Sequence, residues 1–101
     1  MTDQKTILKF LTSGNVDEIL EQRGSRYGSF KEHALITQQI KSTMMRGQSI
    51  KNMTPSQWEA LEMIAHKIGR IVNGDPNYVD SWDDIAGYAQ LVSKEIRGEV
   101  V

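Results

Sequence analysis

The sequence predicts an all-α fold: a small bundle of four to five helices, whose core we expect self-association to complete. Three observations lead to this prediction. In the second half of the chain, apolar residues recur at the three- and four-residue spacing of a helix face. Recognisable start and stop signals separate these runs. No window shows the period-two alternation of a half-buried strand.

Three helices are predicted in the first half of the chain. They span residues 3–12, 15–23 and about 29–46. Asn15 is a suitable N-cap for the second helix, and Gly24 is expected to end it. Residues 23–30 (RGSRYGSF) are rich in glycine and serine, which predicts an irregular loop with special backbone angles. Residues 47–53 are expected to form a polar connection.

The last two helices are longer, and the loop between them is short, so we expect them to pack antiparallel. Thr54 is a natural N-cap for the first of them, with Pro55 at the first helical position and Gln57 completing a capping box. The segment 73–76 (NGDP) ends that helix. The next is expected to run from Asp80 or Ser81 to about Arg97. Their predicted buried seams are Trp58, Leu61, Ala65, Ile68 and Val72, widened by Ile64 and Ile71, and then Trp82, Ile85, Ala89, Val92 and Ile96.

Length and composition restrict the class of protein. A chain of 101 residues predicts one domain (1–101), with a core at 15–97 and a tail at 98–101. A helical domain this short often completes its core by pairing, so we expect a homo-oligomer. The net charge of -1 argues against a general nucleic-acid binder. The absence of cysteine, of a signal peptide and of a long apolar run predicts a cytoplasmic protein that is not in a membrane.

Acidic side chains cluster on the last two helices, and this cluster is the main candidate for a site. The candidate metal ligands are Glu59, Glu62, Asp80, Asp83 and Asp84. Antiparallel packing would bring Glu62 and His66 closest to Asp80 and Asp84. Clustered carboxylates repel one another unless a positive charge lies among them. Mg²⁺ prefers oxygen ligands and keeps water for a bound phosphate, so it is the cation that we expect.

Ordinary structural roles explain the same residues, and the spacing alone leaves both interpretations open. Asp80 or Ser81 can cap the last helix, and Asp83 and Asp84 favour the positive end of its dipole. Glu62 and His66 can form a surface hydrogen-bonded pair. Lys67 and Arg70 can neutralise the acids without a metal. Most acidic residues on helix surfaces are simply solvated.

Four segments carry a resemblance to a known family. They are EQRGSRYGSF at 21–30, EALEMIAHKIGRI at 59–71, GDPNY at 74–78 and DSWDDIAGYA at 80–89. The chain resembles, over roughly residues 18–92, a family of small phage and prophage proteins. That family is distantly similar to the MazG-like all-α nucleoside triphosphate pyrophosphohydrolases and to phage nucleotide-modification-associated domains. Glu59-x-x-Glu62 matches the first metal-binding motif of the pyrophosphohydrolases. Asp80-x-x-Asp83 matches the second metal-binding motif, with Asp80 in place of its Glu. An alternative alignment of this motif uses Asp84.

The resemblance implies a mechanism and roles for particular residues. One or two Mg²⁺ ions held by the acidic cluster would activate a water and neutralise a triphosphate, with catalytic roles for Glu62, His66 and Asp84. Nucleotide contacts are implied for Arg23, Arg26, Tyr27, Lys67 and Arg70. A structural His66 and a plain interhelical turn around Tyr27 are the ordinary alternatives. The resulting expectation is a phage-type, MazG-like protein that binds Mg²⁺ and a nucleotide and hydrolyses a nucleoside triphosphate. The alternative is a non-catalytic phage protein that binds a host or phage protein.

Overall fold

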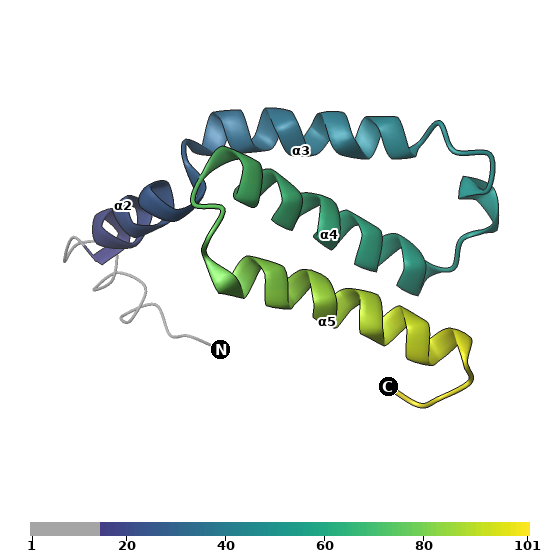
Figure 1. Cartoon of the computed structure of the whole chain (residues 1–101). Helices are drawn as coiled ribbons and strands as arrows, with labels where there is room; N and C mark the ends of the chain where they lie inside the picture. Colours follow the sequence, from purple (N-terminus) through teal and green to yellow (C-terminus); the bar gives the residue numbers. More distant parts are fainter. Residues whose placement is uncertain (1–14) are drawn as a thin grey trace, which may run out of the picture.

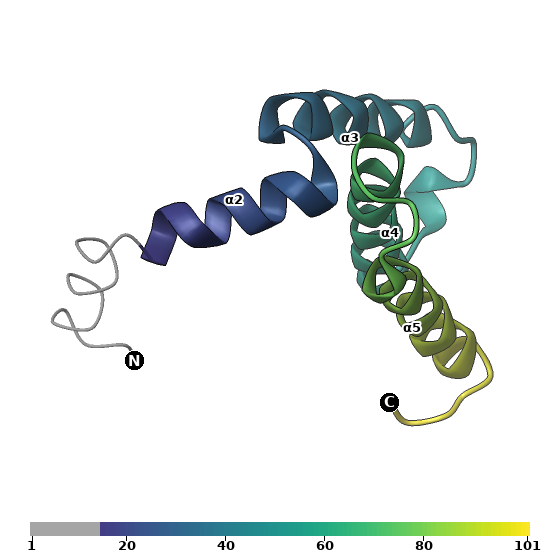
Figure 2. The same cartoon turned by 60° about the vertical axis from the view of Figure 1, so that its left-hand side comes forward.

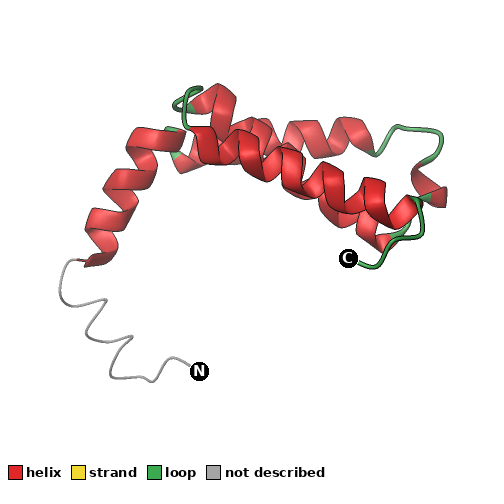
Figure 3. Ribbon diagram, turned by 60° about the horizontal axis from the view of Figure 1, so that its bottom comes forward, coloured by secondary structure: helices red, strands yellow, loops and turns green. Residues whose placement is uncertain are grey.

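The computed structural model describes residues 15–101 and confirms the all-α class for this part of the chain. Its elements are α2 (Asn15–Tyr27), α3 (Phe30–Met44), the short 3-10 helix η1 (Ile50–Asn52), α4 (Pro55–Asn73) and α5 (Val79–Ile96). Helices and loops alone make up the described part (Figure 3). The predicted helix at residues 3–12 lies outside it. None of the described helices combines the length and hydropathy that crossing a membrane requires.

The capping signals of α4 work as the sequence predicts. The Thr54 side chain accepts a hydrogen bond from the Gln57 backbone N–H at 3.2 Å, and the Gln57 side chain accepts one from the Thr54 N–H at 3.0 Å. The helix ends at Asn73, next to Gly74. The predicted start of α5 is wrong by one to two residues, because Tyr78 occupies the N-cap position without a side-chain cap bond. Ser81 is buried in the first turn rather than capping the helix.

The predicted end of α2 and most of the predicted loop at residues 23–30 are wrong. The helix continues through Gly24, where an added Cβ would meet open space, and ends at Tyr27. A glycine inside a helix costs only about 0.5–1 kcal/mol, which does not stop a helix by itself. The break falls at Gly28, whose φ of 76° lies in the left-handed region. Ser29 then caps α3 by accepting a hydrogen bond from the Glu32 N–H.

The three helices α3, α4 and α5 lie side by side, with α4 in the middle and antiparallel to α5 (Figure 1). Gly69 of α4 contacts His33 and Thr37 of α3, whereas Ala60 lies beside Val92 of α5. Nine residues separate Ala60 from Gly69, which places them on opposite sides of α4 at about 100° per residue. Figure 2 shows α2 projecting away from these three helices while its C-terminal end meets them.

This open arrangement changes which apolar side chains are buried. On the predicted seam of α4, Ala65 is buried, but Leu61, Ile68 and Val72 are 40%, 36% and 63% exposed. The prediction that Trp82 is buried is also wrong, since it is 53% exposed. The physical reason is that α3 and α5 cover two opposite sides of α4. The apolar side between them is not covered by another described helix.

Candidate functional site

A pocket of about 360 Å³ lies where α2, the turn after it, α3 and α4 meet. Its size is within the range of about 300–1,000 Å³ that is usual for small-molecule sites. The residues that line it are Leu20, Arg23, Gly24, Tyr27, Gly28, Ser29, Phe30, His33, His66 and Arg70. Four of the residues predicted to have functional roles therefore share one cavity: Arg23, Tyr27, His66 and Arg70. They come from segments about forty residues apart in the sequence.

The turn between α2 and α3 is fixed by contacts with the end of α4. The Asn73 side-chain amide donates hydrogen bonds to the carbonyl oxygens of Tyr27 at 2.9 Å and Ser29 at 3.0 Å. The backbone N–H of Asp75 donates to the carbonyl oxygen of Arg26. Gly28 lies so close to Asn73 that an added Cβ would overlap its backbone. This wall of the pocket is therefore held by the α4–α5 loop, far away in the sequence.

The pocket is cationic and aromatic. The Arg70 guanidinium lies over the Tyr27 ring, 4.2 Å from its centroid, as in a cation–π contact. Arg23 lies on the α2 wall, and no acidic residue lines the cavity. Neither arginine forms an ion pair within residues 15–101. Phe30 at the first position of α3 is 81% exposed, which is unusual for an aromatic ring in a small protein.

Two histidines form the inner wall between α3 and α4. Their rings meet edge to face with centroids 4.6 Å apart. Nε2 of His33 lies 3.1 Å from the His66 carbonyl oxygen and 3.2 Å from Thr37 Oγ1. Because a carbonyl oxygen only accepts, this Nε2 carries a proton and donates. Burial, followed by the nearby Arg70, lowers the pKa of His66 from 6.5 to about 4, so His66 is neutral at pH 7.

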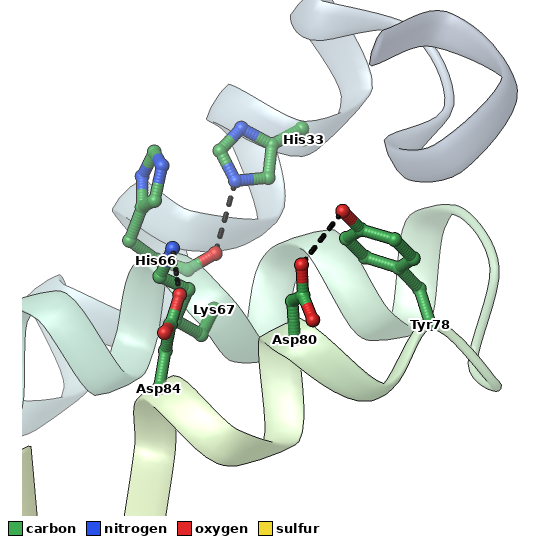
Figure 4. Close-up of polar contacts among 6 residues, drawn as sticks. All are labelled: His33, His66, Lys67, Tyr78, Asp80 and Asp84. Carbon is green, nitrogen blue, oxygen red and sulfur yellow. Dashed lines mark hydrogen bonds and ion pairs between the residues drawn. The ribbon is translucent and has the colours of Figure 1, made fainter. Parts of the chain in front are cut away.

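Two residues predicted to contact the nucleotide point elsewhere. Arg26 lies over the Tyr78 ring, with its guanidinium carbon 4.9 Å from the centroid. Lys67 forms an ion pair with Asp84, at 2.8 Å between Nζ and Oδ2 (Figure 4). Neither residue lines the pocket. The reason is rotation along the helix: Lys67 follows His66 by about 100°, which directs it toward α5.

The acidic residues are dispersed among different partners. Glu62 pairs with Lys41 of α3 at 3.6 Å, and Asp84 pairs with Lys67. Asp80 accepts a hydrogen bond from the Tyr78 hydroxyl at 2.9 Å, a contact that raises the pKa of Tyr78 (Figure 4). Glu59 and Asp83 are exposed and line two other hollows of the surface.

The expected meeting of Glu62 and His66 with Asp80 and Asp84 is therefore not present. Within residues 15–101 of one chain, no three acidic or histidine side chains are placed to hold a metal ion. The ammonium groups of Lys41 and Lys67 lie beside Glu62 and Asp84, so two of the predicted metal ligands already have a positive partner. The side chains of the described residues do not form a preformed Mg²⁺ site.

Phe30 and His33, which line the pocket, and Asn73, which supports its wall, were not predicted as functional residues. His33 and Phe30 were missed because Phe30 fitted an apolar stripe and a single histidine carries no periodic signal. Asn73 was expected only to end α4, yet its side chain also fixes the α2–α3 turn. The family resemblance, through Arg23 and Tyr27 on one segment and His66 and Arg70 on another, was the signal that pointed to this region.

Fold and site together define a small all-α protein with a cationic, aromatic pocket at a helix junction. Residues 14–96 match a family described as a domain of unknown function (DUF6378), and the chain belongs to this family. No curated protein and no solved structure matches the chain. The phage origin and the MazG-like relationship stay predictions from the sequence.

Proposed function

We propose that this protein binds a nucleotide or a similar phosphorylated aromatic compound in the pocket between α2, α3 and α4. The observation that carries the proposal is the meeting of Arg23 and Arg70 with Tyr27 and Phe30 around one cavity. Arginine guanidinium groups suit phosphate oxygens because they offer several N–H donors in one plane. Exposed aromatic rings suit a nucleobase because every base has a face on which a ring can stack.

The N-terminus of α3 adds to the anion-binding character of this cavity. The first backbone N–H groups of a helix lack partners within it and carry partial positive charge. At α3 these groups begin at Phe30, directly on the pocket wall. The phosphate is therefore expected between this terminus and the arginines, with the base against Phe30. Neutral His66 contributes hydrogen bonds without adding charge.

Binding of Mg²⁺ and hydrolysis are separate parts of the proposal, and their support differs. The support for Mg²⁺ is the acidic pattern and the family resemblance, whereas the ion pairs of Glu62 and Asp84 compete with a metal. Hydrolysis by Glu62, His66 and Asp84 rests on the same resemblance. No step of the binding described above requires a metal on these residues.

Calorimetric titration with a panel of nucleotides tests the proposal. Nucleoside mono-, di- and triphosphates, an unphosphorylated nucleoside and inorganic triphosphate separate the phosphate contribution from the base contribution. Each titration is run with EDTA and with Mg²⁺, and pyrophosphate release is measured alongside. We expect phosphate-dependent binding that does not need Mg²⁺, with weaker binding of both the nucleoside and inorganic triphosphate.

Two matched arginine variants locate the site. Arg70→Gln should weaken binding about 10- to 100-fold, because a charge-assisted hydrogen bond contributes about 1.5–3 kcal/mol. Arg97→Gln removes the same charge at an exposed position at the end of α5 and should leave binding unchanged. Equal losses in the two variants would show that binding depends on overall charge, and no binding by any compound would reject the nucleotide proposal.

The second candidate is a non-catalytic protein that binds a host or phage protein. The exposed apolar side chains of α4 and α5 favour some protein contact. This function predicts that the whole nucleotide panel is inert with and without Mg²⁺. The calorimetric experiment therefore separates the two candidates.

A further inference from the structure

One side of α4 is apolar and uncovered in the part of the chain that the structure describes. The apolar stripe consists of Leu61, Ile64, Ile68 and Val72. At about 100° per residue these positions fall within about 80° of one another, so they form one face of the helix. Three of the four are substantially exposed. A helix face of this kind is normally buried.

The stripe continues onto α5. A groove of about 260 Å³ lies between the two helices and is lined by Met53, Gln57, Ala60, Leu61, Ile64, Ala89 and Val92. Trp82 lies two turns before Ala89, on the same face of α5, and about half of its surface is exposed. The uncovered face thus spans parts of two neighbouring helices and contains a depression wide enough for an apolar side chain.

The apolar core of a single chain is small. Only Ala60, Ala65 and Ile71 are buried apolar residues in the described part, and none of its large side chains is fully buried. Each Å² of apolar surface that stays exposed to water forgoes about 25 cal/mol of stabilisation by the hydrophobic effect. Covering the stripe would therefore supply the burial that this core lacks.

We infer that a second copy of this chain covers the apolar stripe, forming a two-fold symmetric dimer. No stripe residue is charged, so a copy of the same surface meets it without like-charge repulsion. In this arrangement Leu61 of one copy enters the groove beside Ile64 of the other, and the reverse contact follows from symmetry. Small helical domains commonly complete their cores in this way.

The available area agrees with the size of a stable dimer interface. The 19 residues of α4 give a length of about 28 Å, at 1.5 Å per residue. Two helices packed 8–10 Å apart, each about 10 Å wide with its side chains, give a width of about 20 Å. The flat area of the face is then on the order of 600 Å². Protruding side chains make its accessible surface larger than this flat area, which brings it toward the roughly 800 Å² per partner of standard interfaces.

The dimer leaves the pocket open. Arg70 is nine positions after Leu61, which places it about 180° away around α4. The pocket and the stripe therefore lie on opposite sides of this helix, and each subunit of the dimer keeps its own pocket. The dimer proposal stands independently of the proposed nucleotide binding.

Sedimentation equilibrium of the full chain over a wide concentration range tests the dimer. The wild-type chain should show twice the monomer mass of 11.4 kDa, with dissociation on dilution. Val72→Glu should raise the dimer Kd about 100-fold, because it buries unpaired charge in an apolar interface. The single chain tolerates this change, since Val72 is largely exposed.

Leu35→Glu is the matched control. Leu35 is also an exposed aliphatic residue, but it lies two residues after buried His33, on the side of α3 that faces away from α4. This variant should dimerise like the wild-type chain. A wild-type chain that stays monomeric at all concentrations would overturn the inference. A dimer that survives Val72→Glu would overturn it too.

Fluorescence provides a second measurement that needs no charged variant. In a Trp58→Phe background, Trp82 is the only tryptophan of the chain. Its quenching by acrylamide should fall as protein concentration rises, because dimer formation covers the half-exposed indole. Quenching that does not change with concentration, while the mass doubles, would place the dimer interface elsewhere and refute the assignment.

Discussion

Replacing Gly69 by alanine tests a close contact between α3 and α4. A Cβ at this position would overlap Thr37 Oγ1 and lie 3.1 Å from Cδ2 of His33. Both neighbours are buried, and they are linked by the hydrogen bond between Thr37 Oγ1 and His33 Nε2. The two helices must therefore separate, or the Thr37 side chain must rotate and lose this bond.

The expected net effect follows from three contributions. Overpacking in a filled core costs about 1–3 kcal/mol. Loss of the Thr37 hydrogen bond costs about 0.5–1.5 kcal/mol. The higher helix propensity of alanine returns about 0.8–1 kcal/mol. Gly69→Ala should thus lower the free energy of unfolding by about 1–3 kcal/mol, and each kcal/mol lowers the Tm of a domain of this size by about 4–8 °C.

Thermal and urea unfolding followed by circular dichroism measure this change at one fixed protein concentration. Gly87→Ala is the matched control, because Gly87 lies within α5 and an added Cβ meets no atom within 4 Å. That variant should gain about 0.5–1 kcal/mol from helix propensity alone. Adding Thr37→Ala to Gly69→Ala should recover part of the lost stability by making room. If Gly69→Ala is as stable as Gly87→Ala, the close α3–α4 contact described above is refuted.

Two further predictions concern the pKa of His66 and the capping box of α4. His66 has a pKa of about 4 in the folded chain against 6.5 when unfolded, so the unfolded state binds more protons and the free energy of unfolding falls as the pH drops from about 6.5 to about 4. Urea titrations over this range should show that His66→Gln makes the free energy of unfolding less dependent on pH. An unchanged pH dependence would contradict the lowered pKa of His66. Thr54→Ala removes the capping bond to the Gln57 N–H and should cost about 0.5–2 kcal/mol in urea unfolding. Ser49→Ala is the control, because Ser49 occupies an N-cap position without a side-chain hydrogen bond, and it should leave the free energy of unfolding nearly unchanged. Equal losses of stability in the two variants would count against the capping box.

The two long helices could be predicted because their signals are local. A capping box at Thr54 and the segment around Pro76 act within a few residues, and both boundaries of α4 follow from them. The end of α2 could not be predicted in this way. Gly24 carries the same local signal as Gly28, and only the packing of Asn73 against the second glycine decides which of them breaks the helix.

The pocket was only partly predictable for a similar reason. The roles of Arg23 and Tyr27 are implied by the family resemblance, and both residues were expected in a loop, although they lie in a helix. His66, Lys67 and Arg70 share one helix, and their roles depend on rotations that decide whether a side chain meets α2 or α5. The acidic cluster does not assemble because Glu62 and Asp84 pair with lysines of neighbouring helices and Asp80 accepts a hydrogen bond from Tyr78, while Glu59 and Asp83 stay exposed.

The sequence by itself determined the all-α class, the limits of α4 and the apolar stripe along it, because helix propensity, capping and periodicity act over a few residues. The tertiary structure decided which sides of α4 are covered, since that depends on where α3 and α5 pack. It also decided that Arg23 and Arg70 meet around one cavity, whereas the predicted metal ligands within residues 15–101 are not placed to hold an ion together. Contacts between segments far apart in the chain set both outcomes, and no local pattern records them.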